Sequence, residues 1–87
     1  MNTIAIQVNS DLKIGDDAIS KNDNFWAGAK HLPLRFKHKI YKMIDIGNGE
    51  IGYINECDNK PNCIQHLTDF IKIKLIKVPT EDELNNE

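Results

Sequence analysis

Apolar and polar residues alternate along several short segments of the chain, which is the pattern of a strand with one buried face. The alternating segments are residues 4–8, 12–14, 16–20, 36–46, 50–56 and 70–78. Asn48 and Gly49 lie between two of them, and an Asn-Gly pair favours a tight hairpin because both central residues of a type I′ turn take a positive φ. The pattern predicts five or six short strands joined by turns, with no long amphipathic helix.

The segments between these strands are polar or irregular. Residues 25–31 are expected to form one helical turn or an ordered loop, within a long loop that spans residues 22–34. Residues 57–63 are expected to form a polar loop, because Pro61 has no N–H to donate to a strand ladder. Residues 64–67 are expected to form a single helical turn.

The periodic apolar positions also predict a core. The expected core residues are Ile14, Ile40, Ile44, Ile51, Ile54, Ile73 and Leu75. Short strands around one such core are typical of a small all-β barrel or sandwich.

The order of these features is similar to that of a known fold. A strand that begins near Gly15-Asp16 precedes a strand that reads Lys39-Ile40-Tyr41-Lys42, and after the hairpin Leu67-Thr68-Asp69-Phe70 leads into the last strand. Residues 12–78 thereby resemble an SH3-like β-barrel of the kind found among bacteriophage accessory proteins. The resemblance implies a single small barrel over residues 1–78, with an N-terminal strand, that binds a peptide, RNA, DNA or a protein.

Length and charge narrow the function classes. The 87 residues suffice for one small domain, and 11 Lys and Arg against 13 Asp and Glu give a net charge of -2. This balance favours neither a chain-wide nucleic-acid binder nor an acidic DNA mimic. Residues 79–87 are expected to form a flexible acidic tail, since they hold four acids and no base. Residues 1–78 then hold eleven bases and nine acids, a mildly basic balance.

No apolar run approaches the roughly 20 residues that a membrane-spanning helix requires, and residues 1–8 lack the basic start of a secretory signal. Cys57 and Cys63 are too few for the disulfide framework of a small secreted domain. We expect a cytoplasmic protein that binds no membrane.

The strongest local signal is a basic segment, residues 25–43, which contains five Lys or Arg residues, two His residues, four aromatic residues and no acid. Proteins that bind single-stranded nucleic acid combine cations for phosphates with aromatic faces for bases. The candidate nucleic-acid-binding residues are Trp26, Lys30, Arg35, Lys37, Lys39, Tyr41 and Lys42. The alternative interpretation is a solvated strand face whose aromatic residues belong to the core. The first function hypothesis is a module that binds RNA or single strands, such as a phage-encoded modulator of host machinery.

The second function hypothesis places a protein partner on Phe25 and Trp26. Four polar residues precede the Phe25-Trp26 pair, and an exposed loop tryptophan is a frequent interface anchor, although a cap on an open barrel end is an equal alternative. The partner would be a host protein, and the chain would inhibit or adapt a host enzyme such as a defence nuclease or toxin.

Catalytic and metal-binding signals are weak. Cys57, Cys63 and His66 have a Cys-x5-Cys-x2-His spacing, which is wider than the cysteine pairs of structural zinc sites, so free thiols are favoured over zinc or a loop disulfide. Asp16 and Asp17 are adjacent, and neighbours on a strand point to opposite faces. We expect no cofactor, no metal and no enzymatic activity.

Overall fold

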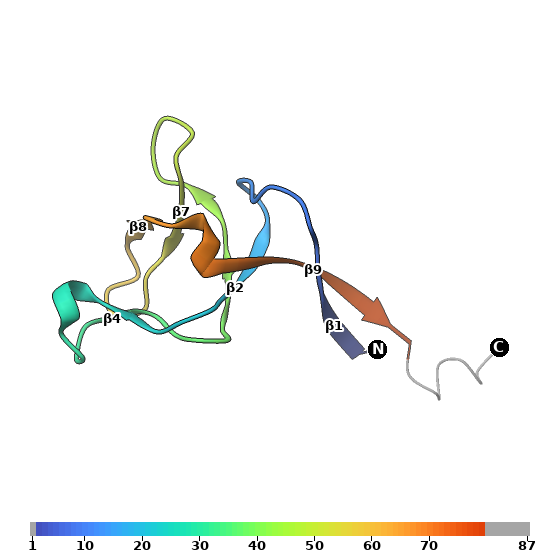
Figure 1. Cartoon of the computed structure of the whole chain (residues 1–87), viewed down its shortest axis with the longest axis horizontal. Coiled ribbons are helices and arrows are strands. Elements are labelled where there is room, and N and C mark those ends of the chain that lie inside the picture. Colours follow the sequence, from blue (N-terminus) through green and yellow to red (C-terminus); the bar gives the residue numbers. More distant parts are fainter. Residues whose placement is uncertain (1, 80–87) are drawn as a thin grey trace.

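The computed structural model describes residues 2–79, and within that range the chain forms nine strands and two short 3₁₀ turns (Figure 1). Every strand pair is antiparallel, so the prediction of an all-β fold is confirmed. No helix in the described range is long and apolar enough to cross a membrane. From residue 80 onward, the expected acidic tail lies outside the described residues.

The largest sheet has four strands in the order β1-β9-β2-β5. These strands are β1 (Asn2–Gln7), β9 (Phe70–Val78), β2 (Asp17–Ser20) and β5 (Ile40–Lys42). The first residues of β9, 70–73, pair with β2, and residues 73–78 pair with β1, so that Ile73 has a partner on both sides. The first and last strands are therefore neighbours, and the predicted strand over residues 70–78 is confirmed.

Two smaller sheets complete the fold. One pairs β3 (Asn24–Phe25) with β4 (Pro33–Arg35), and the turn η1 (Trp26–Gly28) lies between these strands. The other has the order β6-β7-β8, with β6 (Ile44–Asp45), β7 (Ile51–Ile54) and β8 (Pro61–Cys63). The turn η2 (Leu67–Asp69) leads directly into β9. Within residues 2–79 the three sheets are open and do not join into a closed barrel.

The β6-β7 hairpin forms at the predicted Asn-Gly pair. Asn48 and Gly49 have φ values of 53° and 78°, as a type I′ turn requires. The Ile46 N–H donates to the Glu50 carbonyl oxygen at 2.9 Å. The Asp45 carboxylate accepts the Gly47 N–H at 2.8 Å, so the side chain of Asp45 helps to close the turn.

The structure differs from the sequence prediction at two strands and one loop. Residues 12–14 form no strand, because the Lys13 N–H donates to the Asp16 carboxylate at 2.7 Å and closes a turn instead. The strand predicted over residues 36–46 begins only at Ile40, since His38 has a φ of 69° inside a turn. The predicted loop over residues 57–63 contains β8, and Pro61 stands at the first position of this edge strand.

The core is aromatic rather than aliphatic. Its buried residues are Ala18, Tyr41, Met43, Tyr53 and Phe70. The rings of Tyr41 and Tyr53 lie 5.4 Å apart edge to face, and those of Tyr53 and Phe70 lie 5.7 Å apart. Such aromatic pairs stabilise the fold by more than the burial of their apolar surface alone. The core therefore joins β5, β7 and β9, which come from two different sheets.

The predicted isoleucine core is wrong at most positions. Among its seven residues only Ile73 is buried, and Ile44 and Ile51 are half-buried. The other four predicted core residues are exposed, namely Ile14, Ile40, Ile54 and Leu75. Alternation identifies the two faces of a strand, but a face is buried only where another element packs against it.

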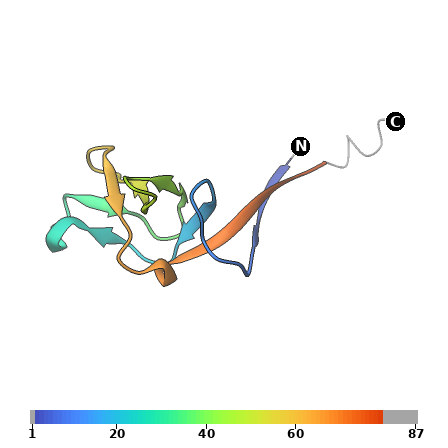
Figure 2. The same cartoon turned by 90° about the horizontal axis from the view of Figure 1, so that it is seen from above.

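The outer part of the large sheet extends away from the remaining strands. Figure 2 shows β1 and the end of β9 as a two-stranded ribbon that leaves the body of the molecule. We call this ribbon, β1 with residues 74–78, the arm. All six residues of β1 are exposed, and the described chain measures 54 × 29 × 20 Å. We call the rest of the described chain the body.

Candidate functional site

A cleft of about 550 Å³ opens in the body beside Trp26. Its lining comes from three stretches of the chain that are distant in sequence. The strand β3 and η1 contribute Asn24, Phe25, Trp26 and Ala27, the strand β4 contributes Leu34 and Arg35, and the chain from β8 to η2 contributes Asn62, Cys63, Gln65 and Asp69. The cleft therefore lies between the two small sheets and combines aromatic, amide and charged side chains.

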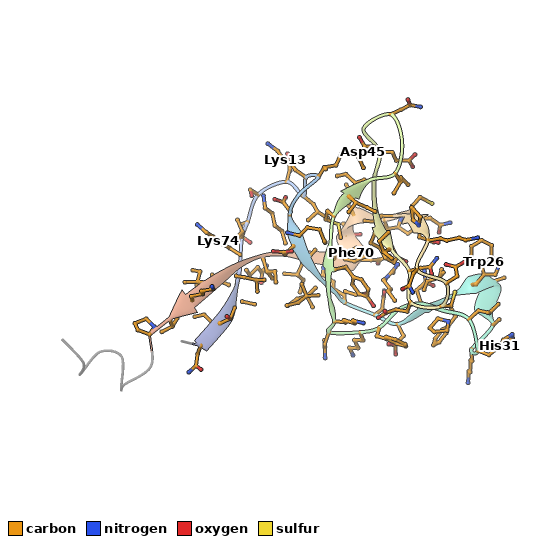
Figure 3. The ribbon with its side chains drawn as sticks, turned by 180° about the vertical axis from the view of Figure 1, so that it is seen from behind. Lys13, Trp26, His31, Asp45, Phe70 and Lys74 are labelled. Atoms are coloured by element: carbon orange, nitrogen blue, oxygen red, sulfur yellow. The ribbon has the colours of Figure 1, made fainter. Side chains whose placement is uncertain are left out.

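Trp26 lies at the edge of this cleft, and 55% of its surface is exposed. The turn η1 holds it there, because its N–H donates to the Leu32 carbonyl oxygen at 2.9 Å and its carbonyl oxygen accepts the Ala29 N–H at 2.8 Å. Ala27 has a φ of 47°, a conformation in which a side chain is disfavoured. Trp26 is thus exposed in a short turn, which is one of the two positions that the sequence left open for it (Figure 3).

Arg35 is buried at the inner end of the cleft, where only 5% of its surface is exposed. Its Nε donates to Ser20 Oγ at 2.9 Å. A terminal nitrogen donates to Asn22 Oδ1 at 2.7 Å and forms an ion pair with the Asp69 carboxylate at 3.3 Å. These bonds use the planar fork of the guanidinium group. Arg35 thus joins β4 to β2 and to η2, and its side chain is not free to bind a phosphate.

Two aromatic rings cover the same guanidinium group. Its carbon lies 5.0 Å from the ring centre of Phe70 and 5.9 Å from that of Tyr53. A cation over an aromatic face is attracted by the negative charge of the ring face, and more strongly when it is removed from water. Arg35 therefore extends the aromatic core toward the cleft.

Tyr41 is also buried, although it was a candidate for base stacking. Its hydroxyl accepts the Phe36 N–H at 2.6 Å and donates to the Glu56 carboxylate at 3.0 Å. Lys39 forms an ion pair with the same carboxylate oxygen. Burial raises the pKa of Tyr41, and the Glu56 carboxylate raises it further. The ring of Tyr41 packs in the core and is not available to a base.

The lysines of the basic segment fall into two groups. Lys39 and Lys42 are paired with carboxylates, and the Lys42–Asp17 distance is 2.9 Å. Lys30 and Lys37 are exposed, and in the described residues no carboxylate lies within ion-pair distance of either. The seven candidate residues therefore do not form one surface. Trp26, Lys30 and Lys37 are exposed, and among residues 2–79 neither of these lysines has a carboxylate partner.

The other chemical candidates lie apart. Cys57 and Cys63 are both exposed and are not joined to each other, and Cys63 lines the cleft whereas Cys57 does not. Asp16 and Asp17 contact different lysines, Lys72 at 3.2 Å and Lys42 at 2.9 Å. The Lys13 N–H lowers the pKa of Asp16. Residues 2–79 hold no group of three His, Cys, Asp or Glu side chains arranged for a metal ion.

Sequence reasoning missed the amide side of the cleft. Asn24, Asn62 and Gln65 all line it, yet they come from segments whose polarity indicated only loops. Residues 61–65, Pro-Asn-Cys-Ile-Gln, do not alternate between apolar and polar side chains and therefore gave no strand signal.

No protein-family model matches the chain, and no curated protein or solved structure is significantly similar to it. The function is therefore inferred from the geometry of the cleft and of the surfaces around it.

Proposed function

We propose that this protein is a non-catalytic module that holds an extended peptide segment of a partner protein in the cleft beside Trp26. The observation that carries the proposal is the position of an exposed tryptophan at a cleft that two unpaired strand edges border. Tryptophan is enriched among the residues that dominate the energy of protein interfaces. A cleft with a few placed polar groups gives such an anchor a defined orientation.

The strand edges supply the backbone part of this site. β3 and β8 both line the cleft, and each is the edge strand of its sheet within residues 2–79. The Asn55 N–H donates to the Lys60 carbonyl oxygen at 2.9 Å, so the alternation of an antiparallel ladder directs the backbone groups of Asn62 toward β7. By the same alternation, the N–H and carbonyl of Cys63 point to the open edge. An extended peptide can add to that edge by backbone hydrogen bonds.

The side chains that line the cleft favour a neutral peptide over a strongly charged ligand. Among the described residues of its lining, Arg35 and Asp69 are the charged ones, and they are paired with each other. Phe25 and Trp26 offer contacts to an apolar side chain, while the amides of Asn62 and Gln65 can bond to either a donor or an acceptor. Specificity is then expected to come from one apolar anchor and the peptide backbone.

The proposal extends to the fold family of the protein and to the kind of partner that it binds. Short antiparallel strands around one aromatic core support the SH3-like resemblance of residues 12–78. In that interpretation the chain is a phage-encoded cytoplasmic protein that acts on a host enzyme, as an inhibitor or adaptor, through the Phe25 and Trp26 surface.

A pooled library of short random peptides, bound to the full chain, tests the proposal. Trp26 is the single tryptophan, so its fluorescence reports on the cleft without an added label. We expect enriched peptides to change that emission. Because Trp26→Ala removes the emission, the affinities of the wild type and the variants are compared by fluorescence anisotropy of a labelled peptide. We expect Trp26→Ala to weaken the affinity about tenfold or more, as removal of a central interface anchor does. Lys37→Ala is the matched control and is expected to leave the affinity unchanged.

The two cysteines provide an internal comparison in the same experiment. Cys63 lines the cleft and Cys57 does not, and both are exposed. A bound peptide is expected to slow alkylation of Cys63 by iodoacetamide and to leave Cys57 at its original rate. The proposal fails if the library yields no binder, or if binders protect neither thiol and bind Trp26→Ala equally well.

A second candidate function is binding of single-stranded RNA, and the exposure of Trp26, Lys30 and Lys37 supports it. A labelled single-stranded RNA would then bind with an affinity that falls with salt, by about 0.7 in the logarithmic slope for each phosphate contact. Lys30→Glu with Lys37→Glu is expected to abolish that binding. Lys42→Gln, which changes a lysine already paired with Asp17, is the control. If RNA binds equally well to the variant with Lys30→Glu and Lys37→Glu, this candidate function is excluded.

A further inference from the structure

The arm leaves apolar side chains in water on a ribbon of only two strands. Residues 2, 4 and 6 lie opposite residues 78, 76 and 74, so these side chains share one face. Ile4 and Ile6 on that face are 45% and 43% exposed, and Val78 is 37% exposed. A two-stranded ribbon is only marginally stable in water by itself. The arm is therefore a surface that gains stability when a further strand joins it.

The direction of the backbone groups shows which edge of the arm is open. The Val8 N–H donates to the Lys72 carbonyl oxygen at 2.9 Å, so the even-numbered residues of β1 bond to β9. The backbone N–H and carbonyl groups of Thr3, Ala5 and Gln7 then point away from β9. In the described residues no strand pairs with this side of β1.

The arm has a second open edge, along the end of β9, and the two edges differ in charge. The end of β9 carries Lys74 and Lys77, and lysine on an edge strand discourages pairing with another chain. The sequence of β1, Asn-Thr-Ile-Ala-Ile-Gln, holds no charged residue. Two copies of β1 can therefore lie side by side without opposing like charges.

We propose that β1 pairs antiparallel with β1 of a second copy of this chain and forms a two-fold symmetric dimer through the arms. A two-fold axis perpendicular to the sheet keeps each face of the ribbon on the same side in both copies. With Ala5 opposite Ala5 of the second copy, the open-edge groups of Thr3 meet those of Gln7. Ile4 then lies beside Ile6 of the other copy. The four-stranded sheet would hold the isoleucines of both copies on one continuous face.

The dimer is expected to be weak, because six residues form a short edge. Sedimentation velocity over a series of protein concentrations is the direct test, with the full chain purified without an added segment at its N-terminus. We expect the mass to rise from one chain toward two as the concentration increases. Ala5→Pro removes one N–H at the open edge of β1 and is expected to leave a monomer throughout.

Leu75→Pro is the matched control for that variant. Leu75 lies opposite Ala5 in the register, and its N–H points to the other open edge of the arm. It is expected to keep the dimer. Because proline can also strain a strand, Ala5→Lys provides a second disruption, since it sets two lysines opposite each other across the two-fold axis. Both variants of Ala5 are expected to melt as the wild-type monomer does.

A crosslink reports on the register. In a background of Cys57→Ser and Cys63→Ser, Ala5→Cys is expected to form a disulfide-linked dimer with oxidised glutathione. Cα atoms of a hydrogen-bonded antiparallel pair lie within reach of a disulfide. Lys77→Cys in that background is expected to stay monomeric. The proposal is overturned by a wild-type chain that is monomeric at every concentration, by a dimer that survives both Ala5 variants, or by a dimer that Leu75→Pro abolishes as well.

Discussion

The two halves of β9 have a similar mixture of apolar residues and lysines but different surroundings. In the body, Phe70 is buried because it packs in the aromatic core, and Ile73 is buried where β1 and β2 both pair with the strand. In the arm, Leu75 and Val78 are 43% and 37% exposed. The comparison shows that burial of a periodic residue depends on the elements that pack against it. The body is therefore the stable unit and carries the cleft, while the arm is an association surface.

The largest loss of stability is expected when an aromatic ring is removed from the core of the body. Phe70 packs against Tyr41 and Tyr53, and its ring contacts the guanidinium group of Arg35. Phe70→Ala is expected to lower the free energy of unfolding by about 3 to 5 kcal/mol, as loss of a buried aromatic side chain does. Urea denaturation followed by circular dichroism measures the change. A loss below about 0.5 kcal/mol would contradict an aromatic core, because changes of that size are typical of surface positions.

The next largest effect is expected at Arg35. Arg35→Leu keeps an apolar contact with the rings but leaves Ser20, Asn22 and Asp69 without their donor. We expect a loss of about 2 to 3 kcal/mol, less than a fully buried pair would give because Asp69 is partly exposed to water. Lys37→Leu, which replaces an exposed cation two residues later, is the control and is expected to change stability by less than about 0.5 kcal/mol.

A smaller effect should appear at alkaline pH. The pKa of Tyr41 is raised above its usual value of 10.0, mainly by burial and further by Glu56. The unfolded chain therefore releases this proton at a lower pH than the folded chain does. The stability that Tyr41 contributes is fully present below pH 10 and is lost as the pH rises above that value. Urea denaturation at several pH values, for the wild type and Tyr41→Phe, measures this contribution. Their difference in stability is expected to change only above pH 10, and a difference that already changes near neutral pH would contradict this assignment.

The smallest effect is expected in the arm. Leu75→Ser replaces an exposed apolar side chain in the second half of β9. In dilute solution, where the chain is monomeric, we expect its free energy of unfolding to change by less than about 0.5 kcal/mol. The same measurement on Ile73→Ser, two residues earlier and buried, provides the comparison. Equal losses for the two variants would show that the arm is part of the core.

The sequence allowed the strands with strong local signals to be predicted. β9 was predicted at its observed bounds because apolar residues and lysines alternate over residues 71–75 and Pro79 ends the apolar run, and the β6-β7 hairpin because Asn48 and Gly49 favour one turn type. The strand before that hairpin was predicted too long, since the alternation of residues 36–39 does not reveal that His38 takes a positive φ. Local pattern thus identified elements better than their bounds.

The environment of single residues was less predictable, because it depends on distant partners. Arg35 belongs to a basic run in the sequence, yet Ser20 and Asp69, which hold it in the core, are 15 and 34 residues away. For Trp26, the polar residues 21–24 indicated an exposed or half-buried loop position with a barrel-end cap as an equal alternative, and the structure leaves the residue 55% exposed. The cleft itself was not predictable, since it requires β3 and β8 to approach each other from different sheets.

Amide hydrogen exchange along β9, followed by NMR in dilute solution, tests the contrast between body and arm most directly. The odd-numbered residues Ile71 and Ile73 pair with β2, and the even-numbered Lys74 and Ile76 pair with β1. We predict that the amides of Ile71 and Ile73 exchange only on global unfolding, whereas those of Lys74 and Ile76 exchange sooner by local opening of the arm. An Ile76 amide that exchanges as slowly as that of Ile73 would contradict the division of this molecule into a stable body and an association arm.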